Sequence, residues 1–260
     1  MSDRTYRTPC PFVNVMTSAA LRAAKNLLRD FREVENLQAS PKEPSGFVTK
    51  ADRRAEKIIH SSLEKAYPNF SFLMEEAGFI QGSDEMTFVV DPLDGTLNFL
   101  KGLPHFAISI ALCQDNEPIA GITLDPVRDE LFWASKNLGA FLNRRRLRID
   151  KPVHRTTHMV ALNRVSVPDG ILKAGCRPRV SGSSTLDLAY VAAGRFDGFV
   201  GQGLSPWDCA TGILLLTEAQ GTFDAPGFQT SHPDGVLPFI RASSLAYTKQ
   251  LCHWFPTPST

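Results

Sequence analysis

Residues 87–99 read TFVVDPLDGTLNF, a run of strand-forming residues that leads directly into two carboxylates. The run predicts a buried strand with Asp91 at its carboxyl end, and Pro92 is expected to end the strand because it lacks a backbone N–H. Gly95 permits a turn close to a ligand, and Thr96 is expected to begin a short helix whose free N–H groups suit an anion. Carboxylates and a hydroxyl are ligands that Mg²⁺ shares with substrate phosphate, so this segment predicts a cation and phosphate site. The alternative interpretation is a simple turn.

Three other acidic positions accompany this segment. Glu75 and Glu76 follow the apolar run SFLM, and because neighbouring residues on a strand face opposite sides, at most one of them can face a site. Asp52 lies near the start of a predicted helix, and Asp208 directly precedes an apolar helix. Taken singly, these are ordinary features: a solvated pair, a residue that complements the first helical turn, and a helix N-cap.

The rest of the pattern indicates alternating helices and strands. An amphipathic helix is predicted over residues 13–31, and a second from Thr49 or Asp52 to Tyr67. Strand patterns follow at 71–76, 87–91, 106–113, 119–125, 130–135, 139–143 and 146–149, with a loop at 78–85. Beyond a boundary expected at Lys151-Pro152, strands at 159–165, 196–200, 222–225 and 238–242 alternate with helices at 185–195, 209–220 and 246–255. The pattern predicts an α+β first half joined to an α/β second half.

The composition is that of an ordinary soluble globule, with 43% hydrophobic residues, 21% charged residues and a net charge of +1. This balance gives no electrostatic reason to expect a dedicated nucleic-acid binder. The basic run at 143–148 is short, and we interpret it as a solvated turn, with a phosphate or partner patch as the alternative. Scattered cysteines without a CxxC spacing, the lack of a signal-peptide pattern and the lack of a long apolar run predict a cytoplasmic protein that does not enter a membrane.

The combination of acidic motifs resembles one family, the Mg²⁺-dependent and Li⁺-sensitive inositol monophosphatases. The resemblance runs from about Val13 to Gly221 and includes GFVTKAD, SFLMEEAG, VVDPLDGTLNF, GAFLN, GSSTLDLAYVAAGRFDGF and GLSPWDCATGILLLTEAQG. It implies a layered αβαβα sandwich, with an α+β half at 1–150 that carries most metal ligands. An α/β half at 151–260 would supply Asp208 and the substrate contacts. The resemblance also implies a homodimer.

The family pattern implies a set of metal ligands. Glu75, Asp91 and the backbone carbonyl of Leu93 are expected to hold one Mg²⁺. Asp91, Asp94 and Asp208 are expected to hold a second, with two to three ions in each site.

The same resemblance implies the catalytic and substrate-binding residues. Asp52 and Thr96 are expected to orient and deprotonate the attacking water, beside Glu75. The N–H groups of Gly95 and Thr96 would hold the phosphate. The full set expected to bind substrate is Asp94, Gly95, Thr96, Gly182, Ser183 and Ser184.

These roles imply hydrolysis of a small phosphate monoester by metal-activated water, with inositol 1-phosphate as the leading substrate. Gly201 stands where members that hydrolyse inositol phosphates usually carry a glutamate for a substrate hydroxyl. Fructose 1,6-bisphosphate, histidinol phosphate and 3′-phosphoadenosine nucleotides therefore remain alternatives, and Gly201→Glu is expected to improve turnover of inositol 1-phosphate. A further alternative is a partner of RNA or the transcription machinery, which the net charge does not support.

Overall fold

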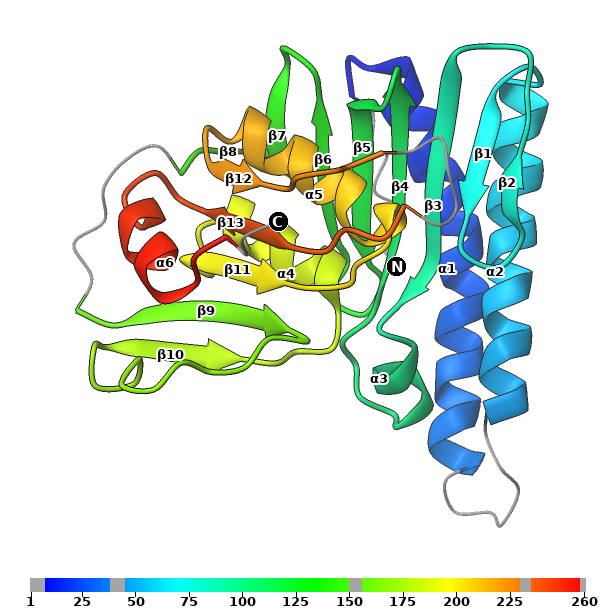
Figure 1. Ribbon diagram of the computed structural model, residues 1–260. Coiled ribbons are helices and arrows are strands. Elements are labelled where there is room, and N and C mark those ends of the chain that lie inside the picture. Colours follow the sequence, from blue (N-terminus) through cyan, green and yellow to red (C-terminus); the bar gives the residue numbers. More distant parts are fainter. Residues whose placement is uncertain (1–7, 38–44, 150–155, 230–234, 258–260) are drawn as a thin grey trace.

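Two β-sheets and three groups of helices build the protein, which the computed structural model describes over residues 8–37, 45–149, 156–229 and 235–257 (Figure 1). The helices are α1 (Pro11–Leu37), α2 (Ser45–Ala66), α3 (Thr96–Leu100), α4 (Ser184–Ala192), α5 (Pro206–Glu218) and α6 (Thr248–Trp254). The first sheet contains β1 (Ser71–Met74), β2 (Gly78–Ile80), β3 (Met86–Asp94), β4 (Ala107–Gln114), β5 (Glu117–Asp125), β6 (Glu130–Ser135), β7 (Gly139–Leu142) and β8 (Arg145–Leu147). The second sheet contains β9 (His158–Asn163), β10 (Cys176–Arg179), β11 (Gly198–Gly201), β12 (Thr222–Asp224) and β13 (Ile240–Ser243).

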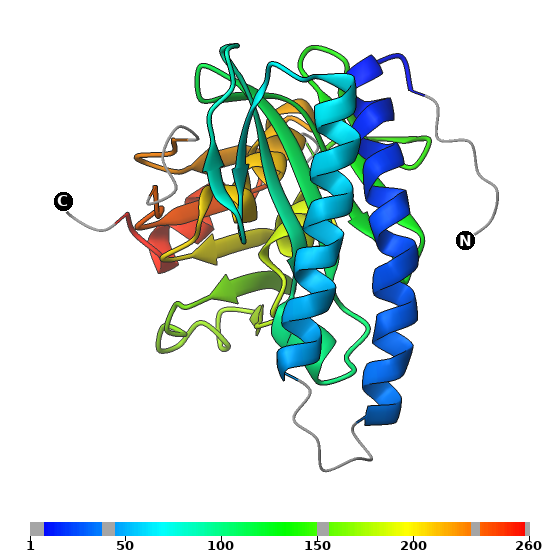
Figure 2. The same ribbon diagram turned by 90° about the vertical axis from the view of Figure 1, so that its right-hand side faces the viewer.

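The layers follow the order helix, sheet, helix, sheet, helix (Figures 1 and 2). Helices α1 and α2 cover one face of the first sheet, α4 and α5 lie between the two sheets, and α6 packs on the second sheet. Four apolar clusters of described residues hold these layers together, because each layer buries its hydrophobic face against the next. The predicted αβαβα sandwich is confirmed.

The two N-terminal helices run side by side as an antiparallel pair (Figure 2). Along α1, Val13, Met16, Ala20 and Leu27 are buried at helical spacing, which confirms the predicted amphipathic helix. Helix α2 begins at Ser45, earlier than predicted. Packing explains the extension.

In the first turns of α2, Val48, Ala51 and Asp52 share one buried face. Burial of that face favours the helical conformation through Gly46 despite the low helix propensity of glycine. Asp52 therefore lies inside the helix and does not complement its first turn, contrary to one interpretation of the sequence.

In the first sheet, β1 and β3 are parallel, and β3 to β8 form an antiparallel meander, in which β4 to β8 correspond to the strand patterns predicted after Pro104. The prediction that Pro92 ends the strand was wrong. Asp91 pairs with Ser109 and Asp94 pairs with Ala107, so one extra residue bulges on β3 and Pro92 sits where the ladder is already interrupted. The predicted loop at 78–85 contains β2, which pairs with β1.

The second sheet has the order β10-β9-β11-β13-β12. Strands β10, β9 and β11 are parallel, so their carboxyl ends meet at one edge. Strand β10 was not predicted, because Pro178 and two arginines in its sequence argue against a strand; an edge position tolerates them. The boundary expected at Lys151-Pro152 lies outside the described residues. Within the described residues, no helix has the length and hydropathy to cross a membrane, and the five cysteines are free thiols.

Candidate metal and phosphate site

Three carboxylates, two from β3 and one from α5, converge between the layers. Asp91 and Asp94 flank the bulge of β3, and Asp208 lies in the first turn of α5. One oxygen from each of the three lies within 4.8 Å of the others. Asp91 and Asp94 are only 2% and 8% exposed, so their charges are largely shielded from water. The bulge matters because it lets both carboxylates reach the same side of the strand end.

Asp208 is held by its own helix. Its Oδ2 accepts a hydrogen bond of 2.7 Å from the backbone N–H of Ser205, and the two residues form a capping box. The interpretation of Asp208 as the N-cap was therefore wrong, because Ser205 occupies that position and Asp208 is the third residue inward. This arrangement fixes one oxygen of Asp208 and leaves the other for the carboxylate cluster.

Glu75 and Asp52 add two buried oxygens that lack hydrogen-bond partners. Glu75 directly follows β1, and its backbone N–H donates to the carbonyl of Val90 beside Asp91. Glu75 Oε2 and Asp52 Oδ1 are both buried with no donor among the described residues. An unsatisfied buried carboxylate oxygen is costly, and a bound cation is the partner that removes this cost. The donor set therefore fits hard divalent cations such as Mg²⁺.

The raised pKa values of these carboxylates also indicate a cation site. Burial raises the pKa of Asp91 well above its usual range, and Glu75, Asp94 and Asp208 raise it further. Burial, followed by repulsion from Glu75, raises the pKa of Asp52 to about 8. Burial raises the pKa of Glu75 to about 7, although its hydrogen bond with Asp91 opposes the shift.

Asp208 shares this environment, because burial and then the charge of Asp94 raise its pKa to about 7. A divalent cation would reverse these shifts by stabilising the ionised carboxylates. Buried carboxylates that repel one another in the absence of a cation are typical of a metal site.

One oxygen of Asp94 is clamped by the start of α4. The hydroxyl of Ser183 and both the backbone N–H and the hydroxyl of Thr185 donate to Asp94 Oδ2, the last two at 2.9 and 2.6 Å. Sequence reasoning missed Thr185, although its position in the first turn after Gly182-Ser183-Ser184 was visible.

Of the three predicted substrate residues at the start of α4, Ser183 and Ser184 form hydrogen bonds within the protein. Ser183 bonds to Asp94, and the buried hydroxyl of Ser184 accepts a hydrogen bond of 2.6 Å from the side-chain amide of Asn163. Gly182 has φ +84°, and a Cβ there would lie 2.9 Å from the amide nitrogen of Asn98. Glycine is therefore required by both conformation and space.

The turn after β3 brings the two halves together. Gly95 has φ +90° and caps α3, and a Cβ there would lie 2.9 Å from the carbonyl oxygen of His105 and 3.4 Å from that of Gly182. Thr96 begins α3 as predicted, and its exposed side chain donates to the carbonyl of Leu93 at 3.0 Å. The expected metal ligand Leu93 and the expected catalytic Thr96 are thus in direct contact.

Glu76 turns away from the site. Its side chain pairs with Arg53 at 2.9 Å, and its backbone N–H donates to Glu56 at 2.9 Å. This agrees with the prediction that one glutamate of the pair at most faces the site. Glu56 and Arg53, both on α2, were missed by sequence reasoning because helical acids and bases are usually solvated.

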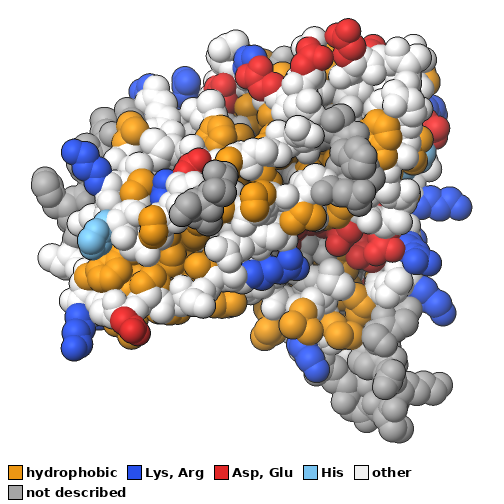
Figure 3. All heavy atoms as spheres, viewed as in Figure 1, with side chains coloured by type: hydrophobic (Ala, Val, Ile, Leu, Met, Phe, Trp, Pro, Cys, Tyr) orange, Lys and Arg blue, Asp and Glu red, His pale blue; other side chains and the backbone are white. Residues whose placement is uncertain are grey.

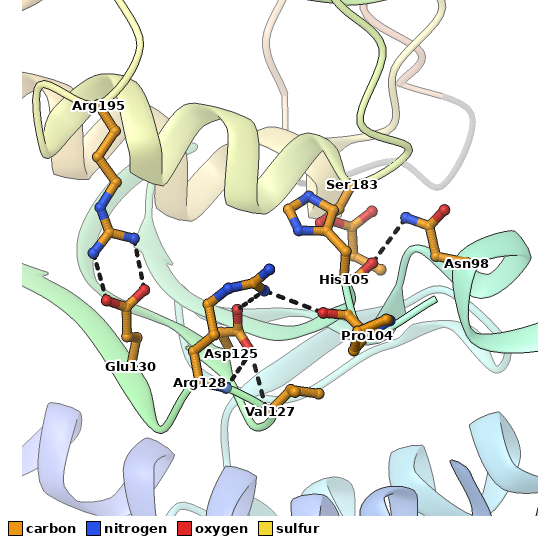
Figure 4. Close-up of polar contacts among 10 residues, drawn as sticks. Asn98, Pro104, His105, Asp125, Val127, Arg128, Glu130, Ser183 and Arg195 are labelled. Carbon is orange, nitrogen blue, oxygen red and sulfur yellow. Dashed lines mark hydrogen bonds and ion pairs between the residues drawn. The ribbon is translucent and has the colours of Figure 1, made fainter. Parts of the chain in front are cut away.

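A polar network supports the loop that follows α3 (Figure 4). Asn98 donates to the carbonyl oxygens of His105 at 2.8 Å and Ser181 at 2.9 Å. Arg128 donates to the carbonyl of Pro104 at 3.1 Å and pairs with Asp125 at 2.8 Å. These bonds hold the segments that follow β3 and α3 against the segment before α4.

The site's sequence has clear relatives. The sequence model of the "Inositol monophosphatase family" matches residues 10–241. The chain belongs to the inositol monophosphatase family.

Similar members of the family carry two kinds of name. The chain is 45% identical over 221 residues to an "Inositol-1-monophosphatase" of Mesorhizobium japonicum, covering 80% of this chain and 83% of that protein. It is 39% identical over 223 residues to "Nus factor SuhB" of Escherichia coli K12, covering 81% and 84%. The crystal structure of extragenic suppressor protein suhB from Bartonella henselae superposes with a TM-score of 0.79 at 38% identity, covering 95% of this chain and all of that one.

Proposed function

We propose that this chain hydrolyses a small phosphate monoester with Mg²⁺ held at the carboxylate cluster. The observation that carries the proposal is the convergence of Asp91, Asp94 and Asp208 within 4.8 Å, beside two buried oxygens without donors. Membership of the inositol monophosphatase family supports the same reaction class.

The proposed ligands are those that the family resemblance implies. Glu75, Asp91 and the carbonyl of Leu93 hold one ion, Asp91, Asp94 and Asp208 hold a second, and a site takes two to three ions. Bound Mg²⁺ neutralises phosphoryl oxygens and acidifies a bound water. Ser205 and Thr185 keep the ligating oxygens of Asp208 and Asp94 directed at the cluster.

The chain's own residues then move the proton. Asp52 accepts it from the attacking water, because its buried Oδ1 has no other hydrogen-bond donor among the described residues. Thr96 donates its hydroxyl hydrogen to Leu93, so its oxygen still has lone pairs that accept a hydrogen bond from the water. The N–H groups of Gly95 and Thr96 hold the phosphate. The water oxygen bonds to phosphorus and the bond between phosphorus and the alcohol oxygen breaks; the leaving alkoxide takes a proton from solvent, and Asp52 returns its proton to solvent.

We propose a sugar or polyol phosphate as the substrate, with inositol 1-phosphate as the first candidate. The relatives named "Inositol-1-monophosphatase" support this choice. Gly201 argues against assigning the relatives' substrate directly to this chain, because apolar side chains fill the space around it. A Cβ there would lie 2.7 Å from Leu204 Cδ1 and 3.0 Å from the ring of Phe199.

The test is release of inorganic phosphate from inositol 1-phosphate, fructose 1,6-bisphosphate, histidinol phosphate and 3′-phosphoadenosine 5′-phosphate. We expect turnover that requires Mg²⁺, disappears with a chelator and is inhibited by Li⁺. An absence of turnover on all four substrates would refute the enzymatic proposal.

A second candidate role is contact with the transcription machinery. The similarity to relatives named "Nus factor SuhB" favours it. The exposed arginines of the turn into β8, Arg144, Arg145 and Arg146, offer a basic surface for such a partner. A pull-down of RNA polymerase with wild-type protein and with all three arginines changed to glutamine tests this role independently of phosphate release.

We also propose a cytoplasmic homodimer. The free cysteines favour a reducing compartment. Leu97, Leu103 and Val180 are 66%, 54% and 77% exposed, and Asn98 links their two segments through its bond to Ser181. Such neighbouring exposed apolar side chains suit contact with a second copy. Light scattering on wild-type protein and on Val180→Asp would detect the dimer and its loss.

A further inference from the structure

Three segments at one edge of the second sheet border the space into which the alcohol part of the proposed substrate would extend. These are residues 163–166 after β9, 201–205 after β11, and 181–185 at the start of α4. Strands β9 and β11 are parallel neighbours, with Asn163 opposite Gly201, so both segments leave the sheet at its carboxyl edge. Ligands of α/β sheets bind at this edge.

Two of the segments also touch the carboxylate cluster. Ser183 and Thr185 bond to Asp94, and Ser205 bonds to Asp208. A substrate whose phosphate lies at the cluster therefore extends its alcohol part toward these segments.

Arg164 is the only residue with an ionisable side chain in these three segments, all of which the structure describes. Its guanidinium is exposed and donates to the carbonyl of Gly203 at 2.5 Å. Within the described residues, no carboxylate forms an ion pair with it. Its partner Gly203 lies two residues before Ser205, whose backbone N–H bonds to Asp208.

The backbone around Arg164 is fixed by its neighbours. Arg164 has φ +55° and Gly203 has φ +62°, so both adopt the left-handed conformation. The backbone N–H of Gln202 donates to the carbonyl of Asn163 at 3.1 Å, and the Asn163 amide bonds to Ser184. The guanidinium therefore projects from a loop that is tied to both β11 and α4. On the face drawn in Figure 3, one group of acidic side chains near the middle has basic side chains to either side of it.

We propose that Arg164 is a specificity-determining residue, and that the preferred substrates are phosphate monoesters whose alcohol part carries a second anionic group, a carboxylate or a phosphate. The inference rests on the proposed phosphatase function. A guanidinium presents several donors in one plane and forms paired, charge-assisted hydrogen bonds with either group. One N–H group of Arg164 donates to the carbonyl of Gly203, so its remaining N–H groups can donate to an incoming substrate.

The test uses two substrate pairs that differ by one anionic group. 2-Phosphoglycerate and glycerol 2-phosphate differ by a carboxylate, and fructose 1,6-bisphosphate and fructose 1-phosphate differ by a phosphate. For each pair the ratio of kcat/KM values is measured with Mg²⁺ for wild type, Arg164→Gln, Arg164→Lys and Arg22→Gln. Arg22 is an exposed arginine of α1 and serves as the matched control.

We expect Arg164→Gln to lower the ratio about tenfold, which corresponds to about 1.4 kcal/mol. The loss should appear mainly in KM, Arg164→Lys should retain part of the preference, and Arg22→Gln should leave the ratio unchanged. In the wild type, raising the salt concentration should lower the ratio, because the contact is exposed and electrostatic. This salt test does not depend on the folding of any variant.

The outcomes separate the two proposals. Phosphate release from inositol 1-phosphate but from none of these four substrates overturns this inference alone, and no release from inositol 1-phosphate or from any of the other substrates overturns the proposed function as well. Turnover of the substrates with a ratio that neither Arg164→Gln nor salt changes overturns the role of Arg164 alone. A ratio that falls for one pair only supports the role and identifies the anionic group that Arg164 recognises.

Discussion

The hydroxyl and the backbone N–H of Thr185 donate to the same oxygen of Asp94, at 2.6 and 2.9 Å. Asp94 belongs to the first sheet and Thr185 to a helix between the sheets, so the bond crosses a layer boundary. Because one carboxylate oxygen is occupied, the other is oriented toward Asp91 and Asp208. Bonds of this kind tune metal affinity without contact to the metal.

Thr185→Val is expected to lower Mg²⁺ affinity about tenfold, because partners behind a metal ligand typically contribute about 10- to 100-fold. The valine keeps the shape and the backbone N–H and removes only the hydroxyl. Thr185→Ser is the control and should retain most of the affinity. Activity titrated against Mg²⁺ measures the change, and an unaltered half-saturating Mg²⁺ concentration in the valine variant would contradict this role.

Asp91→Asn should reduce turnover more than about 100-fold, because it removes a charge expected to be shared by two cations. The fold should remain, since the asparagine Oδ1 still accepts the 3.0 Å hydrogen bond from the Leu93 N–H. Circular dichroism checks the fold and phosphate release checks the turnover. Asp84→Asn, at an exposed loop carboxylate, is the control. Near-wild-type turnover by Asp91→Asn would show that the proposed ligand assignment is wrong.

The metal-free protein should become less stable as pH rises from about 4 to about 8. Asp52, Glu75 and Asp208 have raised pKa values of about 8, 7 and 7 in the folded state. Between the unfolded and folded pKa values the folded state binds more protons, so the free energy of unfolding falls as pH increases.

Mg²⁺ should oppose this trend, because it binds the ionised carboxylates and its stabilisation grows with pH. Thermal melts in EDTA and in Mg²⁺ at pH 5, 6, 7 and 8 measure both slopes. A metal-free melting temperature that climbs across this range would count against the buried, mutually repelling carboxylates.

Gly201→Glu should lower stability by about 1–3 kcal/mol, the usual cost of overpacking. The expectation from the family pattern was improved turnover of inositol 1-phosphate, and the packing changes that expectation. A new Cβ would meet Leu204 at 2.7 Å and Phe199 at 3.0 Å, so the added carboxylate has no space without a rearrangement.

The double variant Gly201→Glu with Leu204→Ala removes the nearest obstacle and should recover part of the lost inositol 1-phosphate activity. Denaturant unfolding and phosphate release measure the two effects. Full stability and faster turnover in the single variant would mean that the apolar neighbours give way easily.

Most helices and strands could be predicted because they follow local patterns, and the layered arrangement was implied by the family resemblance. The amphipathic spacing of α1 and the β-forming run before Asp91 are visible without any knowledge of packing. Failures occurred where tertiary contacts override local preference. Helix α2 extends past Gly46 because its first turns bury one face, and β10 forms despite Pro178 because it lies at an edge.

The internal support of the site was beyond sequence reasoning for a similar reason. Thr185 and Asp94 are distant in sequence, and no spacing rule brings them together. Ser183 was expected to contact substrate, whereas its hydroxyl bonds to Asp94. The proposed role of Arg164 depends on its bond to the carbonyl of Gly203, which forms only where two loops meet at the edge of the folded sheet.

The bulge between Asp91 and Asp94 has a consequence for the order of assembly. The bulged strand belongs to the first half of the chain, whereas Asp208 and the clamp on Asp94 come from the second. A nascent chain that has not yet emerged past residue 208 therefore lacks a complete set of ligands, and its carboxylates repel one another. Under the proposed ligand assignment, a cation can therefore reach its full set of ligands only after both halves of the chain have folded together.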